Sequence, residues 1–181
     1  MRLVLCKTMI VTVVLAGIAT ADEPKTGREF ANRAATYYEK KQYDKAIEDC
    51  NEAVRLDPKD AFTYIIRGRC YHELMKFEKA IADFDVAIRE LPKFAIAFNE
   101  RGLSYRKLRN NDKALADYNE SIRLNPKNPN TYANRGVLYS ELGLFHTAIA
   151  DFDESLRLNP KNDSVKERKE SAVKALRDAG K

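Results

Sequence analysis

The sequence predicts an all-α solenoid of four helix-turn-helix repeats, followed by one C-terminal capping helix. Pro58, Pro92, Pro126 and Pro160 recur every 34 residues, each followed by lysine, and Pro24 fits the same spacing. Between the prolines, apolar residues recur at the three- and four-residue spacing of amphipathic helices. A fixed period of this length is typical of stacked units that bury their apolar faces against each other. We therefore expect a binding scaffold.

The period divides most of the chain into units that should each hold two helices. Each proline ends the second helix of a unit, because the residue before proline disfavours helix. An amphipathic segment at 163–179 follows the last unit and should cover its apolar face. The predicted repeats are residues 27–60, 61–94, 95–128 and 129–162.

The composition favours a folded domain without a nucleic-acid partner. The 181 residues are 44% hydrophobic and 33% charged, which is too apolar for a disordered chain. The net charge of +5 is spread over many segments. Nucleic-acid binding usually needs basic residues clustered on one face. We therefore expect no nucleic-acid partner.

Residues 1–21 have the layout of a secretory signal peptide. Arg2 and Lys7 precede an apolar run from Thr8 to Ile18, and Ala19-Thr20-Ala21 provides small residues for cleavage after Ala21. The run is short for a membrane span, so membrane contact is expected only through this transient leader. We predict a secreted or periplasmic protein, with an uncleaved anchor as the alternative.

Two cysteines, Cys50 and Cys70, follow the leader and fall on neighbouring predicted helices. Export would permit a disulfide between them. Free cysteines are also common as small buried apolar residues. The sequence leaves both interpretations open, because it does not give the Cα separation that a disulfide requires.

The repeats resemble the tetratricopeptide repeat family, in which 34-residue helix pairs pack through small residues at fixed positions. The resemblance implies a right-handed solenoid that binds a protein or peptide in its concave groove without catalysis. The small residue of the first helix is Ala34, Gly68, Gly102 or Gly136, and that of the second helix is Ala46, Ala80, Ala114 or Ala148.

The chain departs from the family just before the small residue of each first helix, where arginine replaces the usual leucine. Each second helix also carries an aspartate. Because buried charges are usually paired, we predict a ladder of Arg–Asp ion pairs, within one repeat or between neighbours. The alternative is that each arginine keeps its charged end in water. The residues are Arg33, Arg67, Arg101 and Arg135, with Asp49, Asp83, Asp117 and Asp151.

The sequence shows no catalytic or metal-binding pattern. Its two histidines, His72 and His146, have no carboxylate or thiol at metal-ligand spacing. Its seven glycines are scattered and form no phosphate-binding loop. We therefore expect no enzyme, no cofactor and no metal.

The resemblance also implies which residues line the concave groove. The carboxylate clamp of the chaperone-binding members is absent, because Ile66, Ile96 and Glu100 stand at three of its positions. Instead we predict an apolar patch, rimmed by polar groups, that binds a protein or peptide of unknown identity. The alternative is a homodimer that associates through the same groove. The predicted ligand groove consists of Phe62, Ile65, Ile66, Arg69, Ile96, Asn99, Leu103, Arg106, Lys107 and Asn134.

Overall fold

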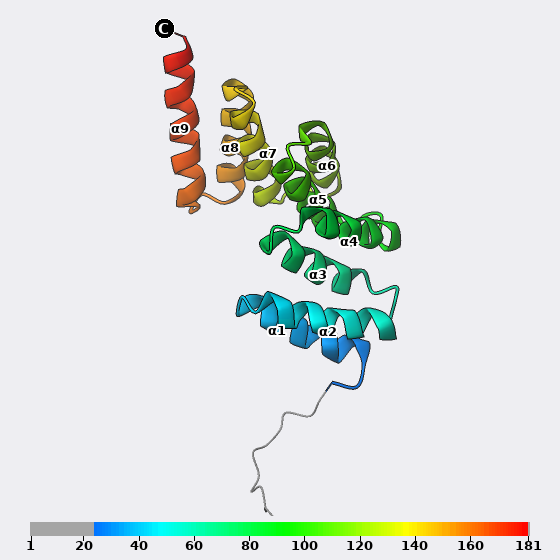
Figure 1. Ribbon diagram of the computed structural model, residues 1–181. Helices are drawn as coiled ribbons and strands as arrows, with labels where there is room; N and C mark the ends of the chain where they lie inside the picture. Colours follow the sequence, from blue (N-terminus) through cyan, green and yellow to red (C-terminus); the bar gives the residue numbers. More distant parts are fainter. Residues whose placement is uncertain (1–23, 181) are drawn as a thin grey trace, which may run out of the picture.

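The computed structural model describes residues 24–180, so the predicted signal peptide lies outside the described residues. The described residues form nine α-helices and no strand (Figure 1). The helices are α1 Gly27–Glu39, α2 Tyr43–Leu56, α3 Ala61–Glu73, α4 Phe77–Glu90, α5 Ala95–Lys107, α6 Asn111–Leu124, α7 Pro129–Glu141, α8 Phe145–Leu158 and α9 Asp163–Ala179.

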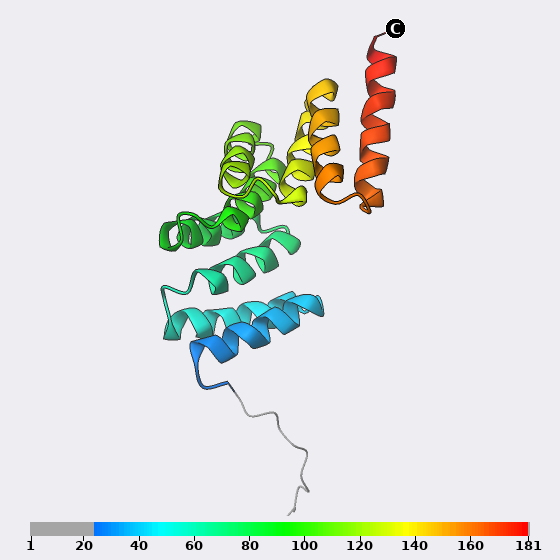
Figure 2. The ribbon, with the colours of Figure 1, turned by 180° about the vertical axis from the view of Figure 1, so that it is seen from behind.

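The helices stack along a curved path, with α1 and α9 at opposite ends (Figures 1 and 2). Each helix packs against the next one in the chain. The first helices α1, α3, α5, α7 and α9 also contact one another in succession, whereas no second helix in the described chain contacts the next second helix. The first helices therefore line the inner, concave side of the array. The predicted all-α solenoid is confirmed.

Most first helices begin at a side chain that accepts a backbone hydrogen bond, as helix starts usually do. Thr26 and Glu29 form a capping box at α1. Asp60, Asn128 and Asn162 provide the cap at α3, α7 and α9. Phe94 begins α5 without such a bond, because its ring has no acceptor.

The turn inside each repeat requires one residue with a positive φ angle. Gly143 fills this position in the fourth repeat with φ 75°, a conformation that glycine adopts without steric cost. The equivalent residues Lys41, Met75 and Arg109 have φ near 57°, where a Cβ atom is unfavourable. Three of the four turns therefore hold a residue under local strain.

The core of each repeat is set by close approach of its two helices. In the last three repeats an aromatic ring lies directly over the glycine of the first helix. A Cβ atom added at Gly68 would lie 2.6 Å from Phe84 Cε1, and one at Gly136 would lie 2.8 Å from Phe152 Cε1. The first repeat has Ala34 and Cys50 at these positions, so a larger first-helix residue is matched by a smaller second-helix residue.

The structure contains the four Arg–Asp pairs of the sequence pattern, and each lies within one repeat. Arg101 Nε donates to Asp117 Oδ2 at 2.9 Å, and Arg101 Nη2 donates to Asp117 Oδ1 at 2.7 Å. The other three pairs, Arg33–Asp49, Arg67–Asp83 and Arg135–Asp151, have the same two bonds.

The third guanidinium nitrogen connects neighbouring repeats. Nη1 of Arg67, Arg101 and Arg135 donates to the second helix of the preceding repeat. Its acceptors are Asn51 at 2.9 Å, Asp85 at 2.6 Å and Asn119 at 2.5 Å. The ladder is thus continuous through these repeats. Aromatic rings also lie close to the guanidinium groups, as with Tyr64 near Arg67, which adds cation–π attraction.

The aspartates of the ladder are buried, and this affects their proton affinity. Burial raises the pKa of Asp83 and of Asp117 above the usual range, because water no longer solvates the charge. The bonded Arg67 and Arg101 oppose that shift and favour the carboxylate. Without its arginine, each aspartate would be a buried, unpaired acid.

Cys50 and Cys70 are free thiols in the structure. Both are fully buried in one apolar cluster with Ala34 and Ala46. Burial raises the pKa of the Cys70 thiol to about 12, and it also raises that of Cys50. Both thiols are therefore protonated at neutral pH and poorly reactive.

Candidate functional site

The concave face carries a row of polar contacts between successive first helices. Arg69 Nη2 on α3 donates to Glu100 Oε1 on α5 at 2.6 Å. Arg106 Nη1 on α5 donates to Glu141 Oε1 on α7 at 3.1 Å. Two of the predicted groove cations are therefore already paired inside the protein. They hold the inner faces of neighbouring repeats together.

Two further contacts complete this row. Asn134 Nδ2 donates to Asn99 Oδ1 at 3.0 Å between α7 and α5. His72 Nδ1 lies 2.9 Å from Ser104 Oγ, and its ring stands edge-on to Phe77. Burial lowers the pKa of His72 below its ordinary value of 6.5. The contact with Ser104 therefore involves a neutral imidazole at pH 7.

The five apolar residues predicted for the groove do not form one exposed patch. Phe62 is 56% exposed and stands edge-on to Phe94 at 5.2 Å between ring centroids. Ile65 is only 4% exposed, because it points into the core cluster around Phe84. Ile66 packs on the cluster of Cys50 and Cys70, and Leu103 packs on that of Tyr118. Ile96 is also half-buried.

Clefts open farther along the concave side, beside α7. One cleft of about 590 Å³ lies between α7, α8 and α9, and one of about 360 Å³ lies between α5, α7 and α9. Val137, Ser164 and Arg168 line both. We call the two together the inner cleft. Of the predicted groove residues, Asn99, Leu103 and Asn134 line it.

A third cleft of about 420 Å³ adjoins the inner cleft through Glu141, which lines both. Arg106, Lys107 and Arg109 make it basic. Lys107 is exposed and forms no ion pair within the described chain. Lys107 and Arg109 therefore give this side of the groove a positive charge, whereas Arg106 is paired with Glu141.

Some buried polar side-chain atoms in this part of the molecule have no hydrogen-bond partner among the described residues. Ser140 Oγ, which lines the inner cleft, is buried without a hydrogen-bond partner among the described residues. Arg106 Nε, in the basic cleft, and the hydroxyl of Tyr118 are in the same situation. A buried polar atom without a partner is costly.

Sequence reasoning assigned α9 only to capping and missed its contribution to the groove. Ser164, Arg168 and Ser171 of α9 line the inner cleft. They stand 34 residues after Asn130, Asn134 and Val137 of α7. Extending the repeat period by one unit would have identified all three.

No three residues among histidine, cysteine, aspartate and glutamate in the described part of the chain are arranged to hold a metal ion. Over the same residues, none of the helices is long and apolar enough to cross a bilayer. The inner cleft thus offers hydrogen-bonding groups, a cationic side and small apolar surfaces. These features suit recognition of a polypeptide segment.

Family comparisons identify the repeats. A tetratricopeptide repeat model matches residues 28–60 and 129–162, and a second TPR repeat model matches residues 102–143. A comparison with curated proteins gives no match.

Solved structures share the fold. A thermophilic TPR protein of Thermus thermophilus is 23% identical, with a TM-score of 0.76 and 83% of each chain covered. MamA is 26% identical, with a TM-score of 0.69, over 78% of this chain and 83% of its own. The first TPR of Spaghetti (RPAP3), bound to the HSP90 peptide SRMEEVD, is 21% identical. Its TM-score is 0.63, over 67% of this chain and 96% of its own. The two repeat models, together with the repeat geometry, show that the chain belongs to the tetratricopeptide repeat family.

Proposed function

We propose that the protein is an exported, non-catalytic adaptor that binds a protein or peptide segment in its concave groove. The observation that carries this proposal is the inner cleft, which combines hydrogen-bonding and apolar side chains on the concave side and adjoins the basic cleft. Family membership supports a role in protein–protein interaction. A structural relative in the family, the TPR of Spaghetti, holds a peptide.

The favoured partner is a segment with carboxylate groups near one end and small or apolar side chains along its length. Carboxylates would meet Lys107 and Arg168, which are exposed cations on the cleft walls. Apolar side chains would contact Val137, which both parts of the inner cleft share. Arg69 and Arg106 contribute less, because Glu100 and Glu141 already neutralise them.

Charge reversal in the cleft tests this proposal. The variant Lys107→Glu with Arg168→Glu should lose its partners in affinity capture from the native envelope fraction. The matched control is Lys59→Glu with Lys127→Glu, in exposed turns with the same total charge change. Partners that bind the groove should fall by about 10-fold in the first variant and persist in the second. Equal recovery from both variants would disprove groove binding.

Self-association through the same groove is the alternative. Light scattering of the purified protein distinguishes the two, since an adaptor with an open groove is monomeric and a groove-mediated scaffold is dimeric. Export is tested separately by N-terminal sequencing of the mature protein. A first residue of Asp22 supports cleavage after Ala21, and a chain that begins at Met1 refutes it.

A further inference from the structure

The last helix, α9, stands where the first helix of a fifth repeat would stand. It begins 34 residues after α7, and Asn162 caps it as Asn128 caps α7. Val165 and Ala172 of α9 are buried in the cluster around Phe152 of α8. The packing of α9 on α8 therefore repeats the packing of every first helix on the second helix before it.

Lys169 extends the charged ladder with an ion pair to the preceding repeat only. It lies 34 residues after Arg135, and its Nζ is 2.5 Å from Asp153 Oδ1 on α8. Arg101 pairs with two carboxylates, Asp85 of the preceding repeat and Asp117 of its own. Lys169 has the first kind of partner and lacks the second, since no second helix follows α9 within residues 24–180.

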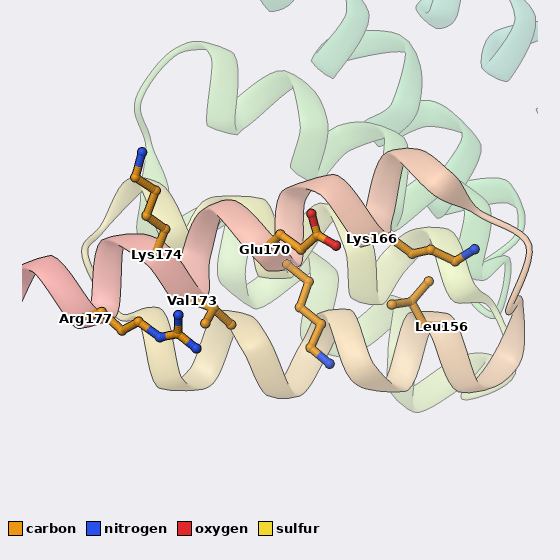
Figure 3. Close-up of a pocket in the computed structure, with 7 residues that line it drawn as sticks. Leu156, Lys166, Glu170, Val173, Lys174 and Arg177 are labelled. Carbon is orange, nitrogen blue, oxygen red and sulfur yellow. The ribbon is translucent and has the colours of Figure 1, made fainter.

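A cleft of about 410 Å³ lies on this face of α9, and we call it the terminal cleft. Figure 3 shows Leu156 of α8 and Val173 of α9 between the two helices, with the guanidinium of Arg177 beside Val173 and the end of Lys174 directed away from them. The surface thus combines an apolar strip with charged side chains around it.

The lining of the terminal cleft carries a net positive charge. Lys166, Lys169, Lys174 and Arg177 line it, and Glu170 is its one acid. Asp163 neutralises Lys166, and Asp153 neutralises Lys169. Lys174 and Arg177 form no ion pair within the described chain. A complementary partner therefore presents an apolar surface to Leu156 and Val173, and acidic side chains to Lys174 and Arg177.

We propose that the terminal cleft binds an acidic amphipathic helix of a partner protein, which lies where a second helix would follow α9. A second copy of the chain is a poor occupant, because pairing of two α9 faces would bring Lys174 and Arg177 against like charges. This surface differs from the inner cleft, so the inference does not depend on the proposed function.

Glu170 limits which helices fit. It takes the position of Gly136, where the ring of Phe152 approaches so closely that a Cβ atom would be 2.8 Å from it. A partner helix with an aromatic residue at this point would collide with the Glu170 side chain. The occupant should instead have a small residue there, one position after an aspartate that reaches Lys169.

The probe is a fluorescent, end-capped peptide with the sequence of α8, residues 145–158, carrying Phe152→Ala. It keeps the aspartate equivalent to Asp151 and presents an apolar face. Fluorescence anisotropy with the full chain should show binding that weakens as salt increases. Lys174→Glu with Arg177→Glu should weaken it by about 10-fold or more. The control Lys59→Glu with Lys127→Glu should change it by less than about 2-fold.

Two peptide variants test the helix geometry. Restoring phenylalanine at the peptide position equivalent to 152 should weaken binding to the wild-type chain. The same change should weaken binding to the Glu170→Gly chain less. A scrambled peptide of the same composition should bind more weakly than the probe. Equal binding of the scrambled peptide, equal loss in the control chain, or no binding at about 1 mM peptide would overturn the proposal. Melting temperatures of the chain variants within about 2 °C of wild type would show that folding is unaffected.

Discussion

Arg101 and Asp117 form a two-bond ion pair between α5 and α6, with both nitrogen–oxygen distances below 3 Å. The side chain of Arg101 is 20% exposed and that of Asp117 is 7% exposed. Arg101 also donates to Asp85 of the preceding repeat. One residue thus connects two repeats and satisfies a buried carboxylate.

The variant Arg101→Met should destabilise the protein by about 3 kcal/mol, because Asp117 would remain buried without its cation. Asp85 should contribute little to this loss, since its side chain is half exposed and can be solvated. Urea unfolding followed by circular dichroism measures the change.

The double variant Arg101→Met with Asp117→Leu provides the control. Replacing both charges by apolar groups removes the unpaired acid, so much of the lost stability should return. If Arg101→Met alone left the stability unchanged, the ladder would not contribute to the fold.

The turn residue Met75 gives a prediction of opposite sign. Its φ angle is 57° and its side chain is 76% exposed, so it is strained and contributes little packing. Met75→Gly should therefore stabilise the protein by about 1 kcal/mol. Gly143→Ala, at the equivalent turn with φ 75°, should destabilise it by a similar amount. Thermal melts of both variants test the pair, and shifts in the same direction would contradict the strain argument.

Close helix packing predicts the effect of filling a glycine. A Cβ atom at Gly102 would lie 2.9 Å from Tyr118 Cε1, and the ring of Tyr118 is fully buried and cannot move away. Gly102→Ala should cost about 1–3 kcal/mol, despite the better helix propensity of alanine. Gly180→Ala should cost almost nothing, since its nearest atoms would be 3.6 Å away. Chemical denaturation distinguishes these outcomes.

The fold was predictable because the same weak sequence signal recurs at the same position in successive repeats. One glycine in a helix indicates little, whereas Gly68, Gly102 and Gly136 at one spacing indicate a packing position. The same reasoning predicted the charged ladder, since recurring arginines and aspartates in a core need partners. It could not decide that Arg67, Arg101 and Arg135 each bond to their own repeat and to the one before it, because that depends on how neighbouring repeats are tilted.

The groove was less predictable, because exposure depends on small rotations of each first helix. Ile65 and Ile66 are adjacent, yet one lies in the cluster of Phe84 and the other on that of Cys50 and Cys70. Family positions alone could not show that Arg69 and Arg106 are neutralised from the next helix. The 34-residue period would have identified Ser164 and Arg168 as groove residues if α9 had been treated as the first helix of a fifth repeat.

His72 predicts a pH dependence of stability. Burial lowers its pKa below 6.5, and this outweighs the opposing influence of Glu100 and Glu73. The unfolded chain therefore binds the proton more tightly than the folded chain does. The stability that neutral His72 provides is complete above about pH 6.5 and is lost as the pH falls from there towards the lower pKa of the folded state.

The variant His72→Gln isolates this effect, because glutamine can keep a hydrogen bond to Ser104 and does not titrate. Free energies of unfolding measured from pH 8 to pH 5 should fall less steeply in the variant than in wild type. His146→Gln serves as the matched control, since that side chain is exposed, and it should retain the wild-type slope. Parallel curves for wild type and His72→Gln would show that the buried imidazole does not control stability in this range.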